Sequence, residues 1–160
     1  MEKIDRIIRH GIFQEHLRQN MEAEADRQFC RHDLVHFLDV ARIGRIINLE
    51  EKLGIDEEMI YGAALLHDIG KHVQYSHGTA HEKASARLAV NILEDCGFDS
   101  KETDVIVDAI ASHRDETVSG ERNLRGLLYR ADKASRPCFC CNAEKDCNWK
   151  TKQKNLSVAY

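Results

Sequence analysis

Proline is almost absent from this chain, since Pro137 is the single one among 160 residues. Proline breaks helices more strongly than any other residue, because it lacks an N–H group and clashes with the preceding turn. Long helices are therefore permitted as far as Pro137. One β-branched run, residues 105–107, has no partner strand elsewhere, so we assign it to a helix as well. The sequence predicts an all-α bundle of about five to six helices.

Capping residues mark where these helices begin. Asp33, Asp56 and Ser100 stand where N-cap residues are favoured. Thr79 and Glu82 have the Thr-x-x-Glu spacing of a capping box. The predicted helices cover residues 3–27 with Gly11 as a candidate break, 33–53, 56–70, 79–96, 100–113 and 121–136.

The length favours one compact domain that buries enough surface to fold without disulfides or structural metals. We assign residues 1–137 to a helical domain and residues 138–160 to a cysteine-rich loop and polar tail. Residues 150–160 are expected to be loosely held.

Charge and hydropathy exclude several classes of protein. Lys and Arg number 23 and Asp and Glu 27, which gives a net charge of -4. This balance argues against a partner that is a nucleic-acid polymer or a membrane surface. No apolar run reaches about 18 residues, and the N-terminal stretch lacks the apolar core of a secretory signal. We therefore expect a cytoplasmic protein whose cysteines are reduced thiols or metal ligands.

Two histidines share helix faces with apolar residues. His36 lies four residues before Val40, and His67 lies three residues after Ala64. At these spacings each histidine shares a helix face with the apolar residue. Both are therefore expected to point into the core. A single core histidine is usually satisfied by ordinary hydrogen bonds, so neither one alone indicates a ligand.

Two aspartates extend this set. Asp68 is adjacent to His67 in a helix that is apolar on nearly every side, and Asp132 lies on the last predicted helix. A buried carboxylate is costly without a partner. Each could be a structural ion pair, but together with two inward histidines they favour a shared divalent cation. Nitrogen and oxygen ligands without thiolates suit Mn, Fe, Co, Ni or Zn.

The order of these residues resembles that of a known superfamily. His36, then His67-Asp68 in LLHDIGK, then Asp132 in LLYRADK, resembles the HD-domain metal-dependent phosphohydrolases. The segments HFLDVARI and AIASHR are also similar to that superfamily, and the resemblance covers residues 30–136. It implies an all-α core of about five helices and hydrolysis of phosphate esters or anhydrides, commonly of nucleotides.

Some branches of this superfamily add histidines that hold a second metal, and His81 and His113 match those positions. The resemblance then implies one ion on His36, His67, Asp68 and Asp132, and a second on Asp68, His81 and His113. Alternatively, His81 and His113 are surface residues near helix ends. His77 could also compete with His81 as a ligand. The implied cofactor is therefore one or two divalent transition-metal ions.

The implied chemistry is attack by metal-activated water on phosphorus, with Asp68 as the central catalytic residue. Lys71 and Arg114 are the best candidates to bind substrate phosphate, because each lies close in sequence to a ligand. His32 is a weaker candidate for contacting phosphate or orienting a ligand. The expected substrate is a nucleotide or another small phosphorylated metabolite.

Three alternatives remain open: a phosphodiesterase acting on dinucleotides, a non-catalytic module that senses metal or nucleotide, and a di-iron HD-type oxygenase. The intact ligand set favours an enzyme, because a sensor need not keep every acid and histidine. The sequence leaves the oligomeric state open.

A second group of metal-ligand residues lies outside the resemblance. Cys138, Cys140, Cys141 and Cys147 fall within ten residues. Cysteines this close together favour a soft-metal site that holds either zinc or an iron–sulfur cluster. A redox switch and an inert loop are the alternatives. Cys30 could approach this group, but nothing in the sequence shows it.

Overall fold

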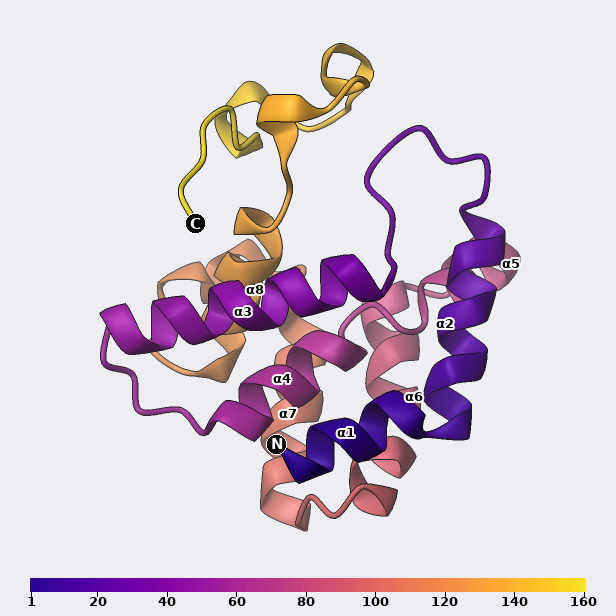
Figure 1. Cartoon of the computed structure of the whole chain (residues 1–160), viewed down its shortest axis with the longest axis vertical. Coiled ribbons are helices and arrows are strands. Elements are labelled where there is room, and N and C mark those ends of the chain that lie inside the picture. Colours follow the sequence, from indigo (N-terminus) through magenta and orange to yellow (C-terminus); the bar gives the residue numbers. More distant parts are fainter.

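The computed structural model describes residues 1–160 and contains eight α-helices and no strands (Figure 1). The helices are α1 (Glu2–Arg9), α2 (Gly11–Ala23), α3 (Leu34–Glu50), α4 (Glu57–Leu66), α5 (Lys71–His77), α6 (His81–Asp95), α7 (Ser100–Ser112) and α8 (Leu124–Ala134). Short 3-10 turns occupy Glu116–Gly120, Cys138–Cys140, Glu144–Asp146 and Thr151–Gln153. The predicted all-α class is confirmed. None of the helices combines the length and apolarity needed to cross a bilayer.

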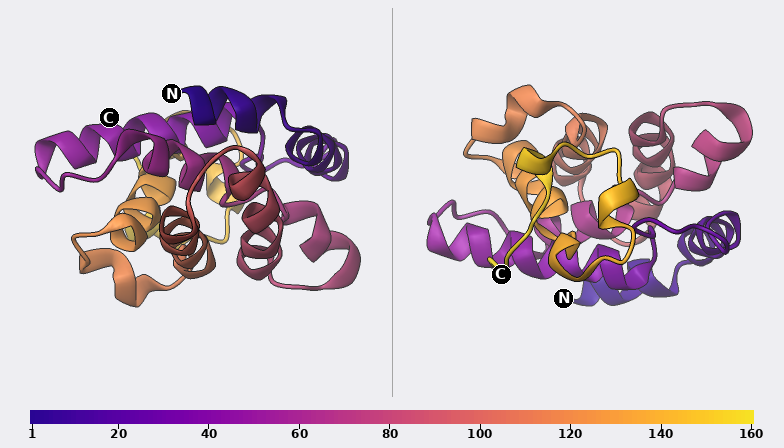
Figure 2. Two further views of the ribbon diagram at one scale, coloured as in Figure 1. Left: turned by 90° about the horizontal axis from the view of Figure 1, so that it is seen from below. Right: turned by 90° about the horizontal axis from the view of Figure 1, so that it is seen from above.

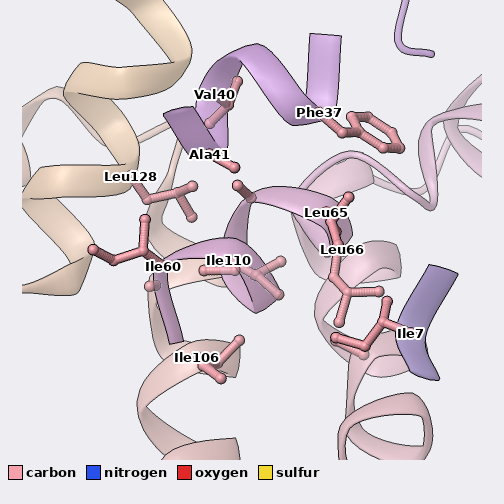
Figure 3. Close-up of a cluster of buried hydrophobic side chains, with 14 of the residues drawn as sticks. Ile7, Phe37, Val40, Ala41, Ile60, Leu65, Leu66, Ile106, Ile110 and Leu128 are labelled. Atoms are coloured by element: carbon pink, nitrogen blue, oxygen red, sulfur yellow. The ribbon is translucent and has the colours of Figure 1, made fainter. Parts of the chain in front are cut away.

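Helix α4 occupies the centre of the molecule, where it contacts α1, α3, α6, α7 and α8. Its residues Leu65 and Leu66 are fully buried. Figure 3 shows them among Ile7 of α1, Phe37 of α3 and Ile110 of α7. Because α4 is surrounded on all sides, the residues that follow its last turn also lie inside the protein.

Two of the predicted helix starts are confirmed in detail. The Asp33 side chain accepts a hydrogen bond from the backbone N–H of His36, and Asp56 caps α4 in the same way. For α7 the cap is Asp99 rather than Ser100, and Asp99 forms a capping box with Glu102. The capping box predicted for Thr79 was wrong, because Ala80 is the N-cap of α6 and provides no side-chain bond.

The other differences lie at helix ends. Residues 71–77 were predicted as a loop, but they form α5, which ends at Gly78 with a positive φ of 71°. The candidate break at Gly11 is present, because His10 adopts an extended conformation between α1 and α2. Helix α8 begins at Leu124 after its Asn123 cap and is therefore shorter than predicted.

The C-terminal tail, residues 138–160, crosses one end of the helical body (Figure 2, right). No residue after Arg136 is buried. One side chain of the segment expected to be loosely held contacts the helical body, since the amide nitrogen of Asn155 lies 2.8 Å from the carbonyl oxygen of Lys133 and 2.9 Å from that of Arg136. Asn155 thus satisfies carbonyl groups at the C-terminal end of α8, which have no partner within the helix.

The turn after α4 packs directly on the backbone of α6. The Gly70 N–H donates to the Ser85 hydroxyl at 2.9 Å. A Cβ atom at Gly70 would lie 2.7 Å from the Ser85 nitrogen and 2.9 Å from the Ala84 carbonyl carbon. Since both are backbone atoms, only glycine allows this close approach.

Gly70→Ala should therefore destabilise the protein by about 1–3 kcal/mol, which is typical of overpacking in a core. The midpoint of urea denaturation measures the change. Gly11→Ala is the matched control, because a Cβ there meets nothing within 4 Å. Equal midpoints for the two variants would contradict the close packing of this turn.

Candidate metal centre

Asp68 lies between two pairs of histidines. Its Oδ2 atom is 3.2 Å from Nε2 of His67 and 3.8 Å from Nε2 of His36. Its Oδ1 atom is 3.1 Å from Nε2 of His81 and 3.4 Å from Nε2 of His113. Each carboxylate oxygen therefore faces a different pair of imidazoles.

The ligand atoms come from the ends of five helices, which are α4 and the helices α3, α6, α7 and α8 that pack on it. His36 is in the first turn of α3, and His67 with Asp68 directly follows α4. His81 is the first residue of α6, and His113 is the C-cap of α7. Asp132 lies in the last turn of α8.

The potential ligand atoms form two sets. Within each set, all of the atoms lie within 4.8 Å of one another, and all of the residues are buried. The first set is His36, His67, Asp68 and Asp132, and the second is Asp68, His81 and His113. These are the two sets that the family resemblance implied. In the first set, Asp132 Oδ1 is 3.5 Å from Nε2 of His36 and 3.7 Å from Nε2 of His67. His77 lies outside both sets, exposed at the end of α5.

Backbone carbonyl groups fix the orientation of two imidazoles. Nδ1 of His67 lies 2.6 Å from the Ala64 oxygen, and Nδ1 of His113 lies 2.6 Å from the Ile110 oxygen. A carbonyl oxygen can only accept, so Nδ1 carries a proton in both rings. Nε2 of each ring is thereby directed at the carboxylates, as in histidines that bind metals.

Several polar atoms of this centre lack hydrogen-bond partners although they are fully buried. They are Nε2 of His36, Nε2 of His67 and Oδ1 of Asp68. Buried polar atoms without a partner are rare in native proteins and need an explanation. A divalent cation would satisfy all three, and the nitrogen and oxygen donors suit Mn, Fe, Co, Ni or Zn. The residues therefore fit a metal.

The protonation of the centre reflects its concentrated negative charge. Burial would raise the pKa of the Asp68 carboxyl, but His67 and His32 hold it well below its usual range. Burial would lower the pKa of His67, but Asp68 and Asp132 outweigh it and raise that pKa to about 9. Burial and the Arg136 guanidinium lower the pKa of His36 to about 4. Two ionised carboxylates thus attract a positive charge to this point of the core.

Basic residues after Asp132 were not assigned to the centre from the sequence. Arg136 is buried, and its Nη2 atom lies 3.3 Å from Oδ1 of Asp132 and 3.9 Å from Oδ2 of Asp68. Lys133 forms an ion pair with the other oxygen of Asp132. Arg136 lies four residues after Asp132, a spacing that puts both on one helix face, whereas nothing in the sequence marks Lys133 as a partner of Asp132.

A buried hydrogen-bonded pair supports the centre from the loop before α3. Nε2 of His32 lies 3.6 Å from Oδ2 of Asp68, and its Nδ1 is 2.5 Å from Oε1 of Glu24. Glu24 also accepts a bond from the Tyr75 hydroxyl at 2.6 Å. Burial would raise the pKa of Glu24, but His32 lowers it to about 2. His32 was a weak candidate in the sequence, and Glu24 was missed because it lies in a charged N-terminal segment.

A cavity of about 990 Å³ opens onto the metal centre. Asp68, His81, His113 and Asp132 line it. Its walls are rich in positive charge, contributed by Arg27, Lys71, Arg114, Arg130, Lys133, Arg136 and Lys152. The cavity therefore combines carboxylate and imidazole groups at the centre with cationic walls, which suits an anionic ligand.

The two predicted phosphate-binding residues both line this cavity. Lys71 is buried, with its Nζ atom 3.2 Å from Nδ1 of His81, and burial lowers its pKa. Arg114 is exposed and follows His113 directly. Part of the wall comes from the tail, where Trp149 and Lys152 face the same space.

Comparison of the sequence with models of known protein families shows to which family the chain belongs. The model of the HD domain family matches residues 34–137, more than half of the chain. The chain belongs to the HD domain family. The matched span contains six of the helices, α3 to α8. It also contains all six residues of the two ligand sets.

Relatives of this HD-domain chain include proteins of similar and of much greater length. An uncharacterized protein of Clostridium beijerinckii is 42% identical over 160 residues, the whole of both chains. Ribonuclease Y of Acetivibrio thermocellus is 32% identical over 126 residues, which are 79% of this chain and 22% of the ribonuclease. Ribonuclease Y of Oleidesulfovibrio alaskensis is 34% identical over 126 residues, again 79% of this chain and 22% of the ribonuclease. The chain thus matches only 22% of the length of either ribonuclease.

A solved structure shares the fold. A predicted HD superfamily hydrolase from an uncultured Thermotogales bacterium aligns with a TM-score of 0.59 and 30% sequence identity. The alignment covers 76% of this HD-domain chain and 66% of that protein. Together with the family match and the buried ligand sets, it supports a metal-dependent hydrolase in general.

Proposed function

We propose that this HD-domain protein hydrolyses a phosphate ester or phosphoanhydride of a nucleotide or another small phosphorylated metabolite. The observation that carries the proposal is the position of Asp68, between two ligand sets and on the wall of a cation-lined cavity. The cavity volume of about 990 Å³ is at the upper end of the range typical of small-molecule sites. A nucleotide is a ligand of suitable size and charge.

Divalent ions held by the two ligand sets would supply an acidified water and positive charge for the phosphoryl group. The remaining work belongs to side chains of the chain itself. Asp68 contributes one oxygen to each set and so fixes their relative position. Lys71 and Arg114 bind phosphate oxygens next to the second set, and Lys71 is already in contact with His81. Their charge balances the anionic substrate as it enters.

A substrate screen tests the proposal. The purified protein is incubated with mononucleotides, dinucleotides and simple phosphomonoesters in the presence of Mn, Fe, Co, Ni or Zn, and the products are separated by ion-exchange chromatography. We expect a phosphate ester or anhydride to be cleaved with at least one metal. No hydrolysis with any metal would contradict the proposal. It would favour the sensing module or, if oxygen is consumed in the presence of iron, the oxygenase.

Arg114→Ala should raise KM about tenfold and change kcat less, because it removes one charged hydrogen bond to the substrate phosphate. Steady-state kinetics on the best substrate of the screen measures both constants. Arg87→Ala is the control, since Arg87 is exposed on α6 and lies outside the cavity. A normal KM for Arg114→Ala would remove Arg114 from the proposed phosphate-binding residues.

The likeness to ribonuclease Y favours a second candidate, cleavage of a phosphodiester. The net charge of -4 argues against long polymers, so a dinucleotide is the more suitable substrate of this kind. Dinucleotides and short RNA oligomers are therefore compared at equal concentration. Cleavage of the dinucleotide alone would support this candidate over mononucleotide hydrolysis, whereas preferential cleavage of the RNA would assign the polymer as substrate.

A further inference from the structure

Cysteines from two distant parts of the chain meet beside the cavity. Cys30 lies in the loop between α2 and α3, whereas Cys138 and Cys147 belong to the tail, and all three line the cavity wall. Burial raises the pKa of the Cys30 thiol, and the nearby thiols of Cys138, Cys141 and Cys147 raise it further. Three tail cysteines are therefore close enough to Cys30 for their charges to interact with it.

The tail presents two of these cysteines with the spacing of a metal site. Cys138 and Cys141 are separated by two residues, and the Cys141 N–H donates to the Cys138 carbonyl at 3.2 Å. Two residues between cysteines on a tight turn is the pair spacing typical of structural zinc sites. Cys147 follows the next 3-10 turn, Glu144–Asp146.

The six cysteines divide by burial into three groups. Cys30, Cys138, Cys141 and Cys147 are half-buried, Cys140 is exposed and Cys96 is buried in the hydrophobic core. The Cys140 thiol contacts the Pro137 carbonyl at 3.5 Å, and no other polar contact involves it. Cys30 therefore replaces Cys140 in the set of four cysteines considered as metal ligands.

We propose that Cys30, Cys138, Cys141 and Cys147 form a four-thiolate site for a zinc ion, separate from the HD metal centre. Four sulfur ligands in a tetrahedral arrangement suit zinc, with Zn–S distances of about 2.3 Å. The sulfurs are more widely spaced than this requires, since no three of them lie within 4.8 Å of one another. Binding draws them together, and the tail is the segment that moves, because none of its residues is buried.

Neighbouring basic residues suit the charge of such a site. Zinc with four thiolates carries two negative charges. The Arg136 guanidinium lies near Cys30 and favours its thiolate. Lys154 is hydrogen-bonded to Glu144, and the negative charges of Glu144, Cys147 and Cys138 raise the pKa of its ammonium group. Two cations therefore stand beside a site of charge minus two.

The site also accounts for how the tail is held. With no buried residue after Arg136, hydrophobic burial contributes little to its position, and Asn155 is its main attachment to α8. Structural zinc supplies folding free energy where a core is lacking. A zinc ion that joins Cys30 to the tail would fix the cavity wall that carries Trp149 and Lys152.

Cobalt substitution tests the site independently of enzymatic activity. Thiolate ligands give Co²⁺ an intense charge-transfer absorption in the near ultraviolet, whereas histidine and aspartate ligands do not. We expect this absorption in the wild-type protein and in Asp68→Ala, which removes the shared ligand of the HD centre. It should be lost in Cys30→Ser and in Cys147→Ser. The matched control, Cys140→Ser, should retain it.

Alkylation of the native wild-type protein provides a measurement that does not depend on the folding of variants. With zinc bound, the four thiols should be protected and Cys140 reactive, and a strong chelator should expose all four. Equal reactivity of Cys30 and Cys140 in the zinc-loaded protein would overturn the proposal. A disulfide among the four cysteines would also overturn it, and the absorption of an iron–sulfur cluster would overturn the zinc assignment.

Discussion

Asp68→Ala should abolish hydrolysis and should also abolish metal binding at the HD centre. Asp68 is the one residue shared by the two ligand sets, and its oxygens lie 3.1–3.8 Å from the nitrogens of the four histidines in those sets. Loss of metal removes several kcal/mol of stabilisation of the transferring group, so activity should fall about a thousandfold or more. Titration with Mn²⁺ by calorimetry measures the binding, because thiolates do not favour this ion.

The control for this variant is Asp104→Ala. Asp104 is exposed on α7 and forms no ion pair, so its removal should change neither Mn²⁺ binding nor turnover. Circular dichroism establishes that both variants keep their helices. Retained hydrolysis by folded Asp68→Ala would refute the assignment of Asp68 as the shared ligand.

His81→Ala should remove one of two bound Mn²⁺ ions and leave the other. His81 belongs only to the second ligand set, whereas His36, His67 and Asp132 stay in place for the first. Hydrolysis should decrease about a hundredfold or more, since part of the charge stabilisation is lost. Binding stoichiometry and kcat are measured on the same preparation.

His77→Ala is the matched histidine control. His77 lies exposed at the end of α5, where its Nδ1 contacts the Ser76 hydroxyl at 2.6 Å. Its substitution should leave two ions bound and kcat unchanged. If His81→Ala binds as many ions as the wild-type protein, the centre holds its metal without the second ligand set.

Much of the fold followed from local chemistry that the sequence displays. Asp33 and Asp56 act as N-caps because their carboxylates bond to nearby backbone N–H groups, a relation that depends on a few adjacent residues. Thr79 failed because the turn after Gly78 places Ala80 at the helix start instead. Helix α5 was missed because its seven residues depend on tertiary contacts with α2 and α6 rather than on a long apolar face.

The centre was partly predictable for a similar reason. The resemblance named all six residues of the two sets, because a ligand must keep its chemical type and its order in the chain. Glu24, Lys133 and Arg136 act on those ligands through space. The contact of Glu24 with His32 depends on how the loop before α3 folds back toward the end of α2, and no local pattern records that path. Lys133 and Arg136 lie one and four residues after Asp132, but their positions in the sequence do not show that their side chains meet its carboxylate.

The cavity is built from two parts of the chain that differ in how freely their residues can be substituted. All six residues of the two HD ligand sets lie within the span that matches the family, residues 34–137, whereas Trp149 and Lys152 lie beyond it. Substitutions at such tail positions can therefore reshape the cavity without disturbing the HD ligand sets or the hydrophobic core. Relatives with identical metal centres can thus evolve different substrate preferences by exchanging only their C-terminal segments.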